Sequence, residues 1–170
     1  SARKELTSRE SVLAAKVYDT FGISSTKVLE GIYDSVESDF TEYYRLINQD
    51  DEEEFIGELS TPSPAKLALN VDFYGRGQFP PGAYHSEGHQ DGMGLCLYLA
   101  LMKHTLGEGF AFSVLDDVLM SVDSGHRREV CGLLKSKFPK TQFMLTTHDP
   151  VWLQFMKTEG LVANTLSFGG

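Results

Sequence analysis

The sequence lacks the marks of a membrane protein, a disulfide-rich secreted protein or a broadly basic nucleic-acid-binding protein. No apolar run is long enough to span a membrane, and no signal-peptide pattern opens the chain. Only two cysteines occur, Cys96 and Cys131, and neither belongs to a CxxC pair. We therefore expect buried, reduced thiols in a cytoplasmic protein. Acidic residues outnumber basic ones, 24 to 15, and the net charge of −9 argues against a broadly basic surface that would bind nucleic acid.

What is present is the composition of an ordinary globular domain. The chain has 170 residues, of which 41% are hydrophobic and 23% charged, enough for one domain with a core. The first residue is Ser and not Met, so we expect a processed or engineered fragment. Acidic residues gather in the first third, notably over residues 50–54, where a solvated loop is expected.

Helical patterns dominate the first fifty residues, and two strand patterns follow them. Apolar spacing predicts a helix over residues 1–22 that ends at Gly22. A second amphipathic helix is predicted over residues 25–48, since its apolar positions recur at steps of three and four. Strands are predicted over residues 55–59 and 67–74, with prolines marking the turn between them.

A polar, glycine-bearing stretch at residues 84–94 is expected to form a loop. We expect residues 95–104 to form a buried helix, because they are apolar on several faces. A loop that feeds the N-terminus of a buried helix presents free N–H groups, which suit a phosphate. From residue 111 the pattern predicts a β-α-β-α-β order with parallel strands. The elements expected there are strands at 111–115, 142–147 and 162–168, and helices from about 125 to 137 and from Pro150.

Carboxylates follow the apolar run 111–115 directly. Asp116 and Asp117 are adjacent, and Asp123 comes after a short apolar step. An apolar run bounded by acids predicts a buried central strand of a parallel sheet, and α/β sheets bind ligands at the carboxyl ends of their strands. His148 follows the next predicted strand, so two neighbouring parallel strands would bring it to the same sheet edge. We therefore expect metal or water chemistry at this edge.

In this arrangement the sequence resembles the C-terminal lobe of an ABC-type ATPase head of the structural-maintenance-of-chromosomes (SMC) and RecF-like class. The resemblance runs from about residue 28 to the end. The segment LDDVLMSVD, which ends at Asp123, matches in register the family's Walker B and D-loop pattern, LDEPTAALD. The resemblance implies that Asp116 holds Mg²⁺, commonly through water. It also implies that Asp117 takes the place of the catalytic glutamate, and that Ser121 and Asp123 belong to a D-loop at a dimer interface.

The resemblance extends to the signature loop, which reads LSGGQ or LSGGE before a helix in the family. Here Ser86 and Gly88 match, whereas the leading Leu, the first Gly and the final residue do not. In the family this loop reaches across a head–head dimer, and its serine hydroxyl and backbone N–H groups donate to the γ-phosphate of the partner's nucleotide. Glu87 would add like charge there. His148 falls on the switch histidine that contacts the same phosphate.

The family's phosphate cradle is missing from this chain, because no G-x-x-x-x-G-K-[ST] motif occurs in it. In the family that P-loop lies in an N-terminal lobe, beyond a long coiled coil. The resemblance thus implies an α/β fold, the C-terminal half of a P-loop NTPase with mostly parallel strands and a buried signature helix. Residues 1–50 would be helices at the base of the coiled coil, and residues 51–170 the C-terminal lobe.

The resemblance also implies partners and cofactors. These are the N-terminal lobe of the same head, a second identical head, DNA, ATP and Mg²⁺, in the cytoplasm and at the nucleoid. The isolated fragment would be inactive. Asp117 is one methylene shorter than the family's glutamate, so we expect slow hydrolysis. Two alternatives stay open: a metal-dependent nuclease of the Toprim type using Asp116, Asp117 and Asp123, and a degenerate head that dimerises without hydrolysis.

Two further polar pairs have competing interpretations. His85 and His89 are four residues apart and, with Glu87 nearby, mimic a metal-binding pair on a helix, although the neighbouring glycines favour a loop. Arg127 and Arg128 follow the D-loop segment and are placed to reach a partner head or DNA. A solvated helix face is the interpretation that we favour for these two arginines.

Overall fold

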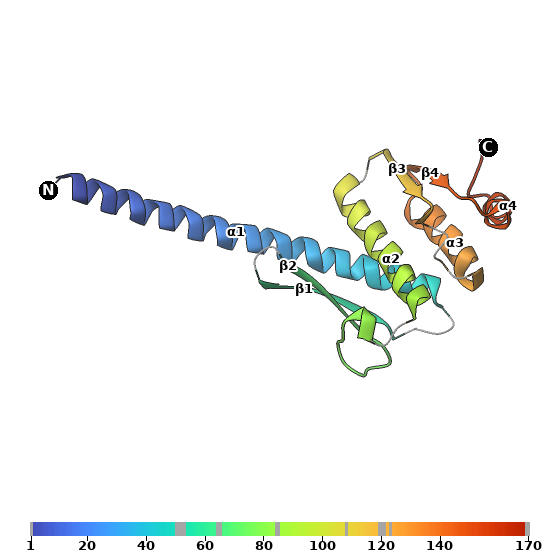
Figure 1. The fold of residues 1–170 in the computed structure, drawn as a ribbon, viewed down its shortest axis with the longest axis horizontal. Helices are drawn as coiled ribbons and strands as arrows, with labels where there is room; N and C mark the ends of the chain where they lie inside the picture. Colours follow the sequence, from blue (N-terminus) through green and yellow to red (C-terminus); the bar gives the residue numbers. More distant parts are fainter. Residues whose placement is uncertain are drawn as a thin grey trace. The chain divides into compact units, whose positions relative to one another are not determined.

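A computed structural model describes the chain except for residues 1, 50–53, 64–65, 84–85, 108, 119–121, 123 and 169–170, and the side chains of residues 2–8, 63 and 66. The chain divides into two units, residues 1–35 and residues 36–170. Figure 1 shows the order of the helices and strands along the chain. Within the described residues, no helix combines the length and apolar character that a membrane crossing requires.

A single helix, α1 (Ala2–Ile47), replaces the two helices predicted for this region. Gly22 does not end it, because this glycine keeps a helical backbone and does not adopt the left-handed conformation of a helix terminus. A glycine inside a helix costs only about 1 kcal/mol, which a long helix tolerates. Within the first unit, the described apolar side chains of α1 are largely exposed, Leu13, Val17 and Phe21 among them.

The last three turns of α1 belong to the second unit and form the middle of its core. Their apolar side chains recur at the predicted steps of three and four and are almost fully buried: Val36, Phe40, Tyr43, Tyr44 and Ile47. The ring of Phe55 packs against two of them, with centroid distances of 5.4 Å to Phe40 and 4.2 Å to Tyr44. Burial of aromatic rings in this way supplies much of a small core's stability.

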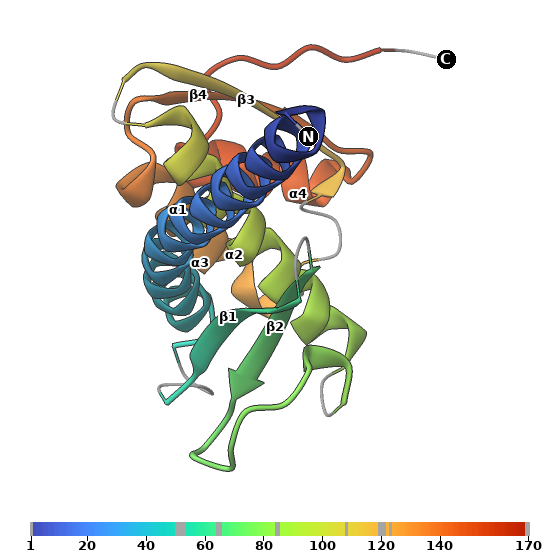
Figure 2. The same cartoon turned by 90° about the vertical axis from the view of Figure 1, so that its left-hand side faces the viewer.

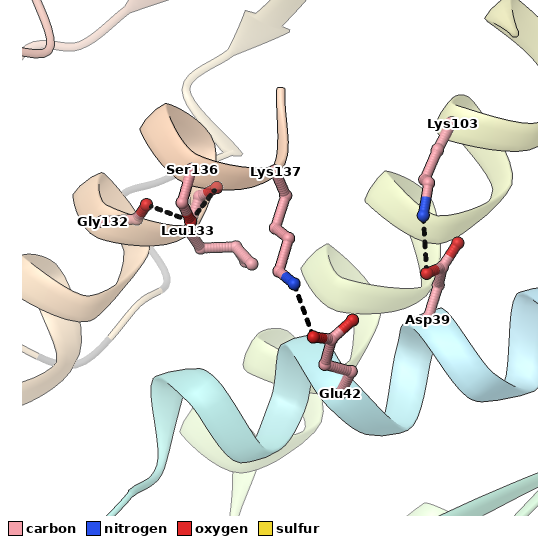
Figure 3. Close-up of polar contacts among 7 residues, drawn as sticks. All are labelled: Asp39, Glu42, Lys103, Gly132, Leu133, Ser136 and Lys137. Carbon is pink, nitrogen blue, oxygen red and sulfur yellow. Dashed lines mark hydrogen bonds and ion pairs between the residues drawn. The ribbon is translucent and has the colours of Figure 1, made fainter. Parts of the chain in front are cut away.

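Ion pairs attach two later helices to this part of α1. Lys103 Nζ lies 2.8 Å from Asp39 Oδ1, and Lys137 Nζ pairs with Glu42 Oε1 (Figure 3). The partners come from α2 (Glu87–Leu106) and α3 (Arg127–Lys137). The end of α1 is thus joined to both helices by charge as well as by apolar packing.

Strands β1 (Ile56–Ser63) and β2 (Lys66–Asp72) form an antiparallel hairpin, which confirms the two strands predicted for this region. Glycine is required at one position of β1. A Cβ at Gly57 would lie 2.3 Å from the ring of Phe40, closer than any side chain permits. The hairpin therefore rests directly on α1.

Helix α2 begins earlier than predicted and is buried on one face only, since Leu95, Cys96 and Leu99 are buried whereas Tyr98 and Leu101 are exposed. The polar stretch 84–94 was expected to be a loop, and from Glu87 onward it is helix. Ser86 caps this helix, and Gly92 lies on its buried side, where a Cβ would make an ordinary contact of 3.9 Å with the ring of Tyr44. A polar, glycine-rich sequence was therefore misread as a loop.

The last third of the chain follows the predicted β-α-β-α order. Strands β3 (Ala111–Asp116) and β4 (Thr141–Thr146) pair in parallel, with α3 between them in sequence, and α4 (Pro150–Thr158) follows β4. The strand predicted over 162–168 is wrong. Residues 161–168 form neither helix nor strand, and the side chains of Leu166 and Phe168 are 85% and 91% exposed. A strand needs a neighbour to pair with, and this segment has no ladder in the described part of the chain.

The prediction that the 111–115 run is buried on both faces is also wrong for this chain. Burial alternates along β3: Ala111, Ser113 and Leu115 are buried, whereas Phe112 and Val114 are 53% and 46% exposed. Met144 of β4 is similarly exposed. The two-stranded sheet therefore has one covered face and one open apolar face. Figure 2 shows this sheet and the β1–β2 hairpin in separate parts of the second unit.

Candidate functional site

Two acids and a threonine meet at the carboxyl ends of β3 and β4. Asp116 is the last residue of β3 and lies opposite Thr146, the last residue of β4. The Thr146 hydroxyl donates a hydrogen bond to Asp116 Oδ1 and accepts one from the backbone N–H of Asp117 at 2.9 Å. One hydroxyl group therefore contacts both acids, the first through its side chain and the second through its backbone.

Asp117 leaves the strand through an unusual backbone conformation. Its φ is 56°, in the left-handed region that non-glycine residues enter at a cost of about 1–2 kcal/mol. This turn directs its carboxylate to His148, whose Nδ1 lies 3.2 Å from Asp117 Oδ2. Both side chains are exposed to solvent. The structure thus places Asp116, Asp117 and His148 at one sheet edge, where their positions in the sequence predict them.

The residue after His148 is held by a second network. Asp149 caps α4, and its Oδ1 accepts hydrogen bonds from the N–H groups of Val151 at 2.8 Å and Trp152 at 3.2 Å. Its Oδ2 accepts from Arg127 Nη1 at 3.1 Å. The bond from the Trp152 N–H, the bond from Val151 and the Arg127 guanidinium hold the pKa of Asp149 below its usual value. The backbone that carries His148 is therefore fixed on its C-terminal side.

Arg127 does not occupy the solvated helix face predicted for it. Its side chain is only 16% exposed, and its guanidinium carbon lies 5.0 Å from the centre of the buried ring of Trp152. Arg128 does match that prediction: it is 72% exposed and lies 3.4 Å from Glu159 Oε1. Arg127 instead joins the start of α3 to the start of α4.

Ser86, Glu87 and Gly88 lie at the start of α2. The Ser86 hydroxyl accepts from the His89 N–H at 3.4 Å and lies 2.8 Å from His89 Nδ1. Ser86 shares no hydrogen bond or ion pair with Asp116, Asp117 or His148 in the described structure. The structure therefore presents two separate groups of predicted site residues.

Several predicted features fall outside the described residues. Ser121 and Asp123, the predicted D-loop residues, are among them, and so is His85. The paired-histidine metal site, the less favoured interpretation of these residues, therefore stays untested. Within the part of the chain that is described, no group of three His, Cys, Asp or Glu residues is arranged to hold a metal ion.

The sequence did not reveal the roles of Thr146 and Asp149 in this region, and Arg127 was assigned to a solvated helix face. The Asp149-Pro150 pair carries a readable signal, because an acid followed by proline is typical of a helix cap and first turn. No sequence signal marks Thr146, since its role depends on the register between β3 and β4. No sequence signal indicates the contacts of Arg127 either, because its partners Asp149 and Trp152 belong to a different helix and its cap.

No protein-family model matches the sequence, and no curated protein matches it. Solved structures do match the fold. The head domain of Smc from Pyrococcus furiosus, with an extended coiled coil and bound to the C-terminal domain of ScpA, has 16% identity and a TM-score of 0.60 over 82% of this chain. The Smc head domain of Pyrococcus yayanosii, with a coiled coil and joint, has 15% identity and a TM-score of 0.61 over 82%.

A third match comes from work on ATP-driven dimerization and DNA-stimulated activation of SMC ATPases. It has 16% identity and a TM-score of 0.57 over 75% of each chain. The present chain spans only 34% and 26% of the two Pyrococcus chains. These likenesses confirm the predicted α/β fold: the chain has the fold of one part of an SMC head domain.

Proposed function

We propose that this chain is the C-terminal lobe of an SMC-like ATPase head, and that two complete heads bind and hydrolyse ATP between them. The observation that carries the proposal is the meeting of Asp116, Asp117 and His148 at one edge of a parallel sheet. The fold of the matching SMC heads supports it.

The acids fit a magnesium ion by their chemistry. Mg²⁺ prefers oxygen ligands and keeps several waters, so one or two carboxylates and the substrate phosphates suffice to hold it. That agrees with two adjacent acids that are exposed at the end of a strand. Asp116 would hold the ion, which supplies charge to neutralise the phosphates when bound.

Asp117 and His148 would act on the attacking water and the transferred phosphate. The Asp117 carboxylate orients the water and accepts its proton, and the His148 imidazole donates to the γ-phosphate. Their contact at 3.2 Å keeps both groups within reach of one small reactant. Asp117 is shorter than a glutamate, and its left-handed backbone sets the direction of the side chain from the strand end.

The start of α2 would serve the nucleotide of the second head. Ser86 and the first turn of α2 lie at the positive end of a twenty-residue helix, which favours a phosphate. Gly88 leaves open space, since nothing lies within 4 Å of a Cβ placed there. Glu87 lowers the positive potential, so engagement in trans is expected to be weak. Ser121 and Asp123 would lie at the same dimer interface.

The open face of β3 and β4 is the expected seat of the N-terminal lobe. Phe112, Val114 and Met144 expose apolar side chains there. A parallel sheet is ordinarily covered on both faces, and a lobe carrying the P-loop would cover this one and supply the phosphate cradle. ATP binding would drive the dimerisation of two complete heads. DNA would be a further ligand of the whole protein. The matching SMC ATPases are described with ATP-driven dimerization and DNA stimulation.

The experiment compares the complete head, meaning this chain together with its P-loop lobe, with the 170-residue chain alone. The complete head should bind and hydrolyse ATP with Mg²⁺, and Asp116→Asn should lower its turnover by about a hundredfold or more. The chain alone should do neither. Tight nucleotide binding by the isolated chain would overturn the assignment. Mg²⁺-dependent DNA cleavage that is lost in Asp116→Ala would favour the nuclease instead.

A further inference from the structure

The hydroxyl of Thr146 contacts both acids of the site. It lies on β4 opposite Asp116, donates to Asp116 Oδ1 and accepts from the Asp117 N–H at 2.9 Å. A hydroxyl has a single proton to donate and can accept through its lone pairs. Both capacities of Thr146 are therefore used on the acid pair.

The first of these bonds fixes the Asp116 side chain. A carboxylate at a strand end rotates freely unless a donor holds one of its oxygens. Because the Thr146 hydroxyl occupies Oδ1, the carboxylate group has a set orientation before any ligand arrives. Such prior orientation of a metal-holding carboxylate raises its affinity for the metal, since less freedom is lost on binding.

The second bond fixes the Asp117 backbone. Its φ of 56° costs free energy, and a conformation of this kind persists only where its surroundings hold it. The Thr146 oxygen accepts the N–H of this same residue. Without that bond, the backbone of Asp117 is free to relax toward the extended region, which would turn its carboxylate away from His148.

We propose that Thr146 is a positioning residue: its hydroxyl orients Asp116 toward a magnesium ion and Asp117 toward His148. The inference rests on the proposed function of these acids. It adds a residue from the neighbouring strand, and it assigns the effect to the hydroxyl and not to the size of the side chain.

The test compares Thr146→Val, which keeps the shape and removes the hydroxyl, with Thr146→Ser, which keeps the hydroxyl. Both are made in the complete head. The first measurement is the Mg²⁺ concentration that gives half-maximal binding of a non-hydrolysable ATP analogue. We expect Thr146→Val to raise it about tenfold, the lower end of the effect of removing a group that supports a metal ligand. Thr146→Ser should stay within about twofold of the wild type.

The second measurement is the exchange of the Asp117 amide hydrogen with solvent. This amide should exchange slowly in the wild type and in Thr146→Ser, and faster in Thr146→Val. A Thr146→Val protein with unchanged Mg²⁺ dependence would overturn the inference while the proposed function stood. A wild-type complete head that binds no nucleotide would overturn the proposed function, and the inference with it. Both measurements are independent of turnover, so a slow enzyme does not obscure them.

Discussion

The imidazole of His148 and the carboxylate of Asp117 form a close pair, with Nδ1 3.2 Å from Oδ2, although each residue follows a different strand. The parallel register of β3 and β4 brings them together, since it sets Asp116 opposite Thr146. Neither side chain is buried, so packing does not hold the pair. Its geometry depends on the backbones that flank it, and several consequences of that dependence can be measured.

Asp117 and His148 are expected to act as one unit in ATP turnover. In the complete head, Asp117→Asn should lower kcat about a hundredfold, because the water loses its base. His148→Ala should lower it less, and the double variant should be little worse than Asp117→Asn alone. Steady-state ATPase assays check this, with nucleotide affinity as the control. Effects that simply multiply in the double variant would show that the two residues act independently.

Gly88→Ala is expected to separate stability from function. Nothing lies within 4 Å of a Cβ at Gly88, so the helix tolerates alanine there and gains from its better helix propensity. The added methyl would nevertheless obstruct a phosphate that approaches the first turn of α2. ATP-driven joining of complete heads, measured by light scattering, should weaken at least tenfold.

Gly94→Ala is the matched control for this experiment. Gly94 also lies in α2 with open space around its Cβ position, but it is farther from the helix start. The Gly94→Ala substitution should raise thermal stability as Gly88→Ala does, and it should leave the dimerisation of the heads unchanged. Equal loss of joining in both variants would point to a general property of α2 and not to its first turn.

Arg127→Met is expected to lower the free energy of unfolding by about 1–3 kcal/mol, since it removes the partner of Asp149 and the cation over Trp152 in a largely covered site. Urea denaturation followed by the fluorescence of Trp152, the single tryptophan of the chain, measures this. Arg128→Met is the control. It should change stability by less than about 0.5 kcal/mol, because exposed ion pairs contribute little. Equal effects would contradict the role given to Arg127.

Asp149 is expected to make stability depend on pH on the acid side. Its pKa is lowered in the folded chain, chiefly by the hydrogen bond from the Trp152 N–H, so the folded state binds its proton less readily than the unfolded state does. The stabilisation is therefore complete above the unfolded value of about 4 and is lost as pH falls through the folded value. Asn at this position still caps a helix but carries no charge.

The gap in stability between the wild type and Asp149→Asn should thus narrow as the pH is lowered from about 6 toward about 2.5. Chemical denaturation at several pH values measures the gap. A gap that stays constant over this range would show that the carboxylate charge contributes nothing to the folded state.

The regular spacing of apolar residues, and the order of helices and strands that it predicts, account for most of what could be predicted from the sequence. The apolar steps of three and four predicted an amphipathic helix over the end of α1, and the residues on its apolar face, Phe40, Tyr43 and Tyr44 among them, are buried. The alternation of strands and helices after residue 111 predicted the parallel pairing of β3 with β4, and so the meeting of the acids with His148. These features are local, or follow from the short connections between neighbouring elements.

The misreadings arose where a local signal depends on its surroundings. Gly22 is a helix terminus only in the left-handed conformation, and nothing in the sequence sets its φ. The glycines after Ser86 suggest a loop, yet the chain is helical from Glu87 onward, with Ser86 as the helix cap. Thr146 joins the site only through the pairing of two strands. None of these three features can be read from residue types and their order in the chain alone.

The open face of β3 and β4 has a consequence for how the chain becomes folded. Two parallel strands with exposed Phe112, Val114 and Met144 resemble a sheet cut in half, and such strands are prone to pair with other chains. During synthesis, this chain alone would attract chaperones or self-associate, and its yield would rise when a covering partner is made in the same cell.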